Sequence, residues 1–153
     1  MKRPILPIMT AAAGAVAYSV SKVDLAFRGE LGMPGFPAPR AAYDSYEPFS
    51  GQLSNAAMGV LLVLLILALA RLPTNRWARR ALLIGNGVAV TVIGLGVAGF
   101  AVRATGAVPW LGAPADGAAA WIALAVGALW TVAWSVAIRR AARSRSASAV
   151  EAG

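Results

Sequence analysis

Four ionisable side chains stand close together in the sequence and are its best candidates for a chemical site. They follow the first apolar stretch of the chain and are Lys22, Asp24, Arg28 and Glu30. Asp24 and Arg28 are four residues apart, in the order that favours an ion pair on a helix, so structural pairing is one interpretation. In the other, Lys22 and Arg28 bind an anionic headgroup or substrate, and Asp24 and Glu30 act as acid–base groups.

The absence of two residue types limits what any site in this chain can do. The sequence contains no Cys and no His. It therefore lacks the ligands for a His-bound haem, a Cys/His zinc site or an iron–sulfur cluster, and it cannot form a disulfide or a Cys–His nucleophile. We expect no metal and no cofactor. Any chemistry would use carboxylate, Lys, Arg, Tyr or hydroxyl groups.

Three aromatic residues form a second candidate group. Tyr43, Tyr46 and Phe49 recur at steps of three within the segment 28–52, which begins with several Gly and Pro residues. This spacing predicts one face of a short helix over 41–49. The aromatics would either form a belt at the membrane interface, or line a pocket or dock a partner over the helices.

Asn86 is the third candidate, because it lies well inside a long apolar segment. Its amide must find a hydrogen bond there, and a neighbouring helix is the expected source. A packing contact between helices is one interpretation, and a polar lining for a pathway or cavity is the other.

The composition indicates that these residues are positioned by membrane helices. Hydrophobic residues make up 59% of the chain and charged residues only 13%, with a mean hydropathy of +0.68. A helix needs roughly 20 apolar residues to cross a bilayer. Four stretches meet this need, which predicts an all-α polytopic membrane protein with a four-helix transmembrane domain over 1–140. The predicted spans are 4–27, 53–72, 81–102 and 118–138.

The basic residues predict the orientation of these spans. Ten of the 14 fall at the two ends of the chain and in the 71–80 connection. Because basic flanks stay in the cytoplasm, both termini are expected inside, with 28–52 as a long outer loop. The residues 141–153 read as a disordered basic tail that meets anionic lipid. Short basic clusters beside apolar spans do not resemble a nucleic-acid interface, so no nucleic-acid partner is expected.

The first span has an alternative interpretation. A basic start, an apolar run and the segment 15–17 resemble a cleavable signal peptide. Pro4 and Pro7 within the apolar run, and an apolar pattern that continues to Phe27, favour a retained helix.

Small residues recur along three of the predicted spans. Such stripes let helices approach closely in lipid, so they predict packing within the chain or self-association through an outward face. The stripes are Ala11, Ala15 and Ser19 in the first span, Gly87, Thr91, Gly94 and Ala98 in the third, and Ala119, Ala123, Gly127, Thr131 and Ser135 in the fourth.

The chain also resembles a family. Four spans, Ser21-Lys22 at the end of the first, and the motif Leu31-Gly32-Met33-Pro34-Gly35-Phe36-Pro37 are similar to small DoxX-like and related uncharacterised bacterial membrane proteins. The Ala, Gly and Arg usage resembles that of actinobacterial proteins. The resemblance implies a multi-pass protein of the bacterial plasma membrane, and a respiratory role in members named as quinone-linked oxidoreductase subunits. No site residue is transferred from it.

Three functions are compatible with these patterns. The favoured one is a non-enzymatic accessory or interaction subunit that contacts another membrane protein. The second is a protein, possibly an enzyme, that binds a lipid or hydrophobic ligand at an outer-leaflet site under the 28–52 loop. The third is an oligomeric transporter or channel subunit.

Overall fold

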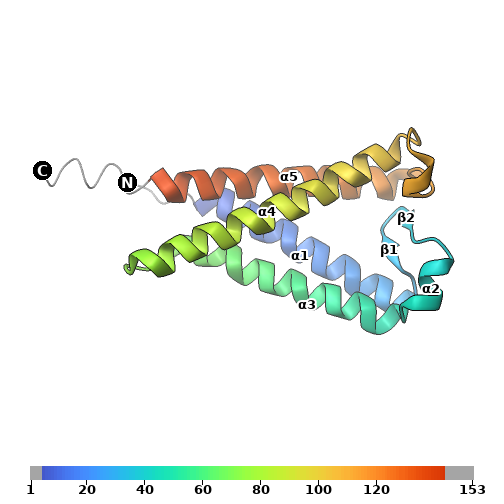
Figure 1. Cartoon of the computed structure of the whole chain (residues 1–153), viewed down its shortest axis with the longest axis horizontal. Helices are drawn as coiled ribbons and strands as arrows, with labels where there is room; N and C mark the ends of the chain where they lie inside the picture. The colour runs from blue at the N-terminus through green and yellow to red at the C-terminus, as the bar shows by residue number, and fades with distance from the viewer. Residues whose placement is uncertain (1–4, 144–153) are drawn as a thin grey trace, which may run out of the picture.

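The computed structural model describes residues 5–143, and long helices account for most of that range (Figure 1). Four helices, one of them extended by a 3-10 turn, are long and apolar enough to cross a membrane. This confirms the prediction of an all-helical chain with four candidate spans. The elements are α1 (Ile5–Arg28), β1 (Gly32–Met33), β2 (Phe36–Pro37), α2 (Ala41–Ser45), α3 (Pro48–Leu67), η1 (Ala68–Ala70), α4 (Arg76–Ala104), η2 (Pro109–Leu111) and α5 (Gly117–Arg143).

The helix α3 begins five residues earlier than predicted. Glu47 caps it, because its carboxylate accepts the backbone N–H groups of Phe49 and Ser50. Pro48 occupies the first turn, where its missing N–H costs nothing. A proline also holds the preceding residue in an extended conformation, as seen at Glu47. The predicted short helix over 41–49 is therefore correct only for Ala41–Ser45, and Phe49 belongs to α3.

The helices α4 and α5 extend beyond their apolar segments through basic residues. Asn75 caps α4 by accepting the backbone N–H of Trp77. At the C-terminal end of α5, residues 141–143 are helical, although the sequence predicted that they belong to a disordered tail. The rest of that tail lies outside the described residues.

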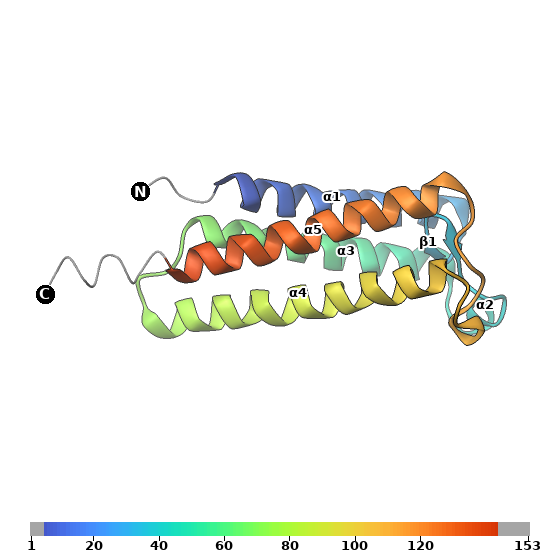
Figure 2. The ribbon, with the colours of Figure 1, turned by 90° about the horizontal axis from the view of Figure 1, so that it is seen from above.

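The long helices run up and down in sequence order (Figures 1 and 2). The start of α1 and the end of α5 lie at the same end as residues 71–75, which we call the connection end. The residues 29–47 and 105–116 lie at the opposite end, which we call the loop end. α1 packs mainly against α3 and α5, and α4 packs mainly against α5. As a result, α3 and α4 lie close at the connection end and diverge toward the loop end (Figure 1).

Two apolar clusters hold the bundle together. The larger one joins α1, α3 and α5, with Trp134 and Ile66 fully buried at its centre. The smaller one lies at the loop end and consists of Phe36, Ala104 and Ala120.

Two of the three small-residue stripes pack within the chain. Ser19 contacts Gly59 of α3, and Gly127 of α5 lies against Val97 of α4. The stripe of α4 does not, because an added Cβ at Gly87 or Gly94 would meet no other group within 4 Å. The prediction that this stripe packs inside the chain is therefore wrong. α4 meets the bundle through larger side chains on a neighbouring face, among them Val90 and Ile93.

Candidate functional site

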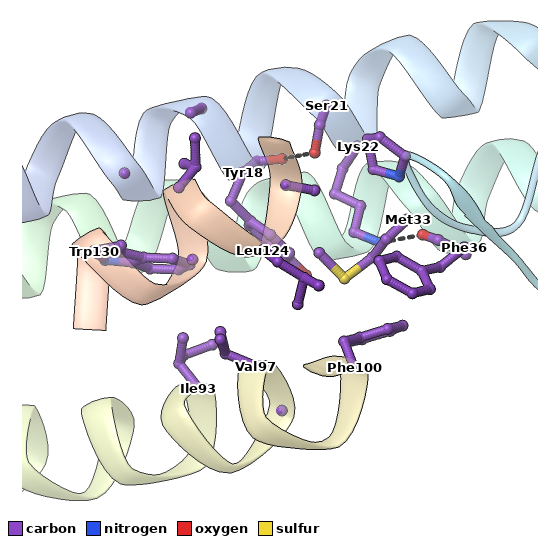
Figure 3. Close-up of a pocket in the computed structure, with 18 of the residues that line it drawn as sticks. Tyr18, Ser21, Lys22, Met33, Phe36, Ile93, Val97, Phe100, Leu124 and Trp130 are labelled. Carbon is purple, nitrogen blue, oxygen red and sulfur yellow. Dashed lines mark hydrogen bonds between the residues drawn. The ribbon is translucent and has the colours of Figure 1, made fainter. Parts of the chain in front are cut away.

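A cavity of about 770 Å³ lies between the helices in the half of the bundle nearest the loop end (Figure 3). All four long helices and the β1–β2 hairpin contribute to it, and its walls are mainly apolar. The lining residues include Gly14, Tyr18, Ser21, Lys22, Met33, Phe36, Gln52, Asn55, Val92, Ile93, Gly96, Val97, Phe100, Ala119, Ala123, Leu124, Gly127 and Trp130. Pockets of about 300–1,000 Å³ are typical of small-ligand sites.

The cavity is open to the surface of the bundle, and its exposed lining residues come from all four long helices, including Ala17 of α1 and Ile122 of α5. Asn55 of α3 and the residues Val92 and Gly96 of α4 line the cavity and are also exposed at the surface of the bundle. In a membrane, these exposed residues would face the acyl chains of neighbouring lipids. A molecule could therefore reach the cavity sideways from the bilayer.

Aromatic side chains lie at both ends of the cavity: Trp130 toward the middle of the bundle, and Phe36 and Phe100 toward the loop end. The ring of Trp130 stacks on that of Trp134, with 5.9 Å between ring centroids and 7° between planes. Its indole N–H has no partner among the described residues. Toward the loop end, Phe36 of the hairpin packs on Phe100 of α4, with centroids 5.1 Å apart.

Lys22 provides the positive charge of the cavity. Only 6% of its surface is exposed. Its Nζ donates a hydrogen bond of 2.6 Å to the carbonyl oxygen of Gly32 and lies 5.4 Å from the centre of the Tyr18 ring. Figure 3 shows the side chain reaching from α1 toward the hairpin. Lys22 therefore contacts the segment 28–52 through the carbonyl oxygen of Gly32.

Gln52 is a cavity residue that the sequence reasoning missed. It is 1% exposed, and its Nε2 donates to the carbonyl oxygens of Glu30, at 2.9 Å, and Gly32, at 3.3 Å. Its Oε1 has no partner among the residues described here. In the sequence Gln52 lies at the end of the 28–52 segment and outside the predicted span 53–72, so the pattern that identified Asn86, an amide well inside an apolar segment, did not apply to it.

Backbone geometry places the hairpin over the cavity. Gly32 and Gly35 have φ angles of +114° and +73°, a region that favours glycine. Gly35 also approaches Ala120 so closely that a side chain would clash with the start of α5, and its carbonyl accepts the N–H of Asp116. The turn of Gly32 presents its carbonyl to both Lys22 and Gln52.

Arg103 ties the two loop-end segments together. Its side chain is 9% exposed, and it donates to the carbonyl oxygens of Pro37 and Ala113, both at 2.8 Å. The guanidinium also lies 5.5 Å from the centre of the Phe36 ring. Arg103 thus holds the hairpin, α4 and the 105–116 loop as one cover for the cavity.

The other three residues of the predicted ionisable cluster lie outside the cavity. Arg28 and Asp24 form an ion pair of 3.0 Å, and more than half of each side chain is exposed. Glu30 is exposed, and its contribution to the site is its backbone carbonyl. Asp24 and Arg28 therefore form a structural pair, and the predicted cluster separates into a buried Lys22 and three exposed residues.

The three loop aromatics do not line the cavity either. The hydroxyl of Tyr43 accepts the backbone N–H of Leu31 at 2.9 Å, which fixes the loop. Tyr46 is 66% exposed. Phe49 packs edge-to-face on Phe27, with centroids 5.8 Å apart.

Asn86 makes the interhelical hydrogen bonds that the sequence predicted. It is fully buried, and its Nδ2 donates to Leu65 of α3 at 3.2 Å and to Leu82 of its own helix at 2.9 Å. Its Oδ1 accepts the indole N–H of Trp134 of α5 at 2.8 Å. Asn86 is not a lining residue of the cavity, so the packing interpretation describes it.

The electrostatics of the cavity suit binding better than catalysis. Within residues 5–143, the only ion pair is that of Arg28 and Asp24, and no group of acidic residues could hold a metal ion. Lys22 therefore meets no carboxylate in the cavity. A buried cation, a free amide oxygen and apolar walls can hold an amphipathic molecule, but they offer no acid–base pair.

The comparisons with known proteins returned no relative. No protein-family model matches the chain, and no curated protein or solved structure matches it. The resemblance to DoxX-like proteins stays a prediction, and the function rests on the geometry of the cavity.

Proposed function

We propose that this protein binds a lipid-like amphipathic molecule inside the membrane, in the cavity between its four long helices. The observation that supports this proposal is the cavity itself, which has a volume of about 770 Å³ and mainly apolar walls, with the polar groups of Lys22 and Gln52 at its loop end. The function is binding, and no enzymatic step is part of it. α1 supplies Lys22 and Tyr18, so the proposal requires α1 to remain in the mature protein, which the mass of the intact protein would test.

The proposed setting is the bacterial plasma membrane, with both termini in the cytoplasm. Seven described arginines support this orientation, because all of them lie at or near the connection end. They are Arg71, Arg76, Arg79, Arg80, Arg139, Arg140 and Arg143. The loop end carries most of the acidic residues. In this orientation the cavity lies in the outer leaflet.

Filling the cavity tests the proposal. Ala123 lines the cavity on α5, whereas Ala125 of the same helix is exposed and does not. We expect wild type and Ala125→Phe to retain lipid when purified in mild detergent, and Ala123→Phe to lose most of it. Native mass spectrometry would count the bound molecules. Equal lipid retention in all three proteins, or none in wild type, would contradict the proposal.

A second candidate is the accessory or interaction subunit favoured by the sequence. The supporting observation is the face of α4 that contains Gly87, Thr91 and Gly94, where the glycines meet no neighbour within 4 Å. Such small-residue faces allow close helix association in membranes. A disulfide crosslink between two Gly94→Cys chains would support self-association, with Val132→Cys, at an exposed position of α5, as the control.

A transporter or channel gains no comparable support. Asn86, which was a candidate for lining a transport pathway, instead forms hydrogen bonds with Leu65, Leu82 and Trp134.

A further inference from the structure

Lys22 is a buried charge whose compensation within the described chain is incomplete. It lines the cavity at 6% exposure and donates one hydrogen bond, to the Gly32 carbonyl. The acidic residue nearest in sequence, Asp24, is paired with Arg28 on an exposed face. Burying an ammonium group without an opposite charge is costly, especially within a membrane. An anionic group in the cavity would reduce that cost.

The side-chain oxygen of Gln52, close to Lys22, lacks a hydrogen-bond donor within residues 5–143. Its Nε2 and the Nζ of Lys22 both donate to the Gly32 carbonyl oxygen, at 3.3 and 2.6 Å, so the two side chains converge there. The Oε1 of Gln52 is a buried acceptor without a partner in the described part of the chain. An unmet buried acceptor costs free energy until a donor reaches it. A headgroup that suits both side chains offers an anionic acceptor to Lys22 and a hydroxyl donor to Gln52.

The dimensions of the cavity fit an acyl chain below such a headgroup. The lining extends along α5 from Ala119 to Trp130, which corresponds to about 16 Å of helix. Half of a hydrocarbon core of ~30 Å has a similar depth. The polar groups lie at the loop end and the apolar walls continue toward the middle of the bundle. A bound lipid would therefore keep the direction of its neighbours in the leaflet, and it could slide in from the leaflet without turning over.

Deepening the proposed function, on which this step rests, we infer that the ligand is an anionic amphiphile with one acyl chain and a hydroxyl-bearing headgroup. Lys22 binds its anionic group, and Gln52 accepts its hydroxyl. A monoacyl glycerophospholipid has this chemistry.

Ligand competition in the delipidated wild-type protein tests the inference without any substitution. Four probes separate the contributions: oleoyl lysophosphatidylglycerol has charge and hydroxyls, monoolein has hydroxyls only, oleyl sulfate has charge only, and glycerol 3-phosphate lacks the chain. Native mass spectrometry would measure the affinities. We expect lysophosphatidylglycerol to bind at least about tenfold more tightly than monoolein. This ratio of dissociation constants is typical of one charge-assisted hydrogen bond. Oleyl sulfate should lie between these two lipids, and glycerol 3-phosphate should not bind.

Variants at Lys22 assign the charge preference to this residue. Lys22→Met should bind lysophosphatidylglycerol and monoolein with similar affinity, because it replaces the ammonium group by an uncharged, unbranched side chain. Lys22→Arg should keep the preference of wild type. Ala123→Phe should weaken the binding of all three probes that carry an 18-carbon chain, because it fills the apolar part of the cavity.

The outcomes separate this inference from the proposed function. Equal binding of lysophosphatidylglycerol and monoolein by wild type would overturn the inference and leave the binding function intact. If none of the three probes with an 18-carbon chain binds, both the inference and the proposed function are wrong. Binding of glycerol 3-phosphate as tightly as the lysolipid would show a headgroup site that does not need the acyl chain, and would also overturn the inference.

Discussion

Single residues in this protein show how one polar group gains its role from where its partners lie. Asn86 and Lys22 are both buried polar residues on apolar helices. Asn86 is satisfied by α3, α4 and α5 together, so it joins helices. Lys22 meets a single carbonyl and an aromatic ring beside a cavity. A buried polar side chain thus serves packing at one site and is available for binding at the other.

Removing the Asn86 amide should loosen the bundle measurably. Asn86→Leu leaves the indole N–H of Trp134 without its acceptor, and interhelical hydrogen bonds in membranes contribute about 0.6–2 kcal/mol. We expect a loss of that size in the free energy of unfolding, measured by denaturant titration in detergent micelles. Thr91→Val is the matched control, because Thr91 is exposed and bonds only to Gly87 of its own helix. Equal stability of the two variants would contradict the role given to Asn86.

The sequence identified Lys22 as a candidate site residue, but not the part of the site that depends on distant backbone groups. It also predicted the Asp24–Arg28 pair from a spacing of four, and the need of Asn86 for a partner from its apolar surroundings, although these residues lie outside the cavity. Gln52 could not be assigned in this way, since it bonds to the carbonyls of Glu30 and Gly32, 20 or more residues away. These carbonyl groups come within reach of Gln52 only when the segment between α1 and α3 has folded back over the two helices.

At the scale of the elements, apolar length predicts the helices well, and local caps set their ends. The four predicted spans correspond to α1, α3, α4 and α5, but Glu47 and Pro48 start α3 before its apolar run begins. The divergence of α3 from α4 has no local signal, because it depends on which faces pack. The stripe containing Gly87 and Gly94 predicted close packing that α4 makes with a different face.

Two glycines allow this packing to be tested. An added Cβ at Gly14 of α1 would lie 2.5 Å from Cγ of Trp130, whereas one at Gly94 of α4 would meet open space. Gly14→Ala should therefore destabilise the α1–α5 contact by about 1–3 kcal/mol, the usual cost of overpacking. Gly94→Ala should leave stability unchanged or raise it, because alanine is the better helix former. The midpoint of thermal unfolding in detergent would measure both effects, and a larger loss for Gly94→Ala would contradict the arrangement.

The whole molecule is best understood as a bundle that is closed at one end and hollow at the other. Apolar packing of α1, α3 and α5 closes the connection end, while Arg103 and the hairpin cover the cavity at the loop end. The lengths of the apolar stretches in the sequence predicted the number of spans. They could not predict the cavity, which exists because α4 leans on α5 and away from α3.

The proposed orientation can be tested directly because the chain has no native Cys. Ser45 at the loop end and Thr74 at the connection end are both exposed. In intact bacterial cells, a membrane-impermeant maleimide should label Ser45→Cys, because the acidic loop end faces outward. It should label Thr74→Cys only after the cells are opened. The reverse pattern would place the cavity in the inner leaflet.

The central claim is that the cavity holds an acyl chain, and photocrosslinking tests it most directly. A lysophospholipid with a diazirine in mid-chain would be activated on the purified protein, and the modified residues would be mapped by mass spectrometry. We expect adducts on the cavity residues Ile93, Val97 and Leu124. Adducts confined to exposed residues outside the cavity, such as Ile84, Val88 and Val132, would contradict it.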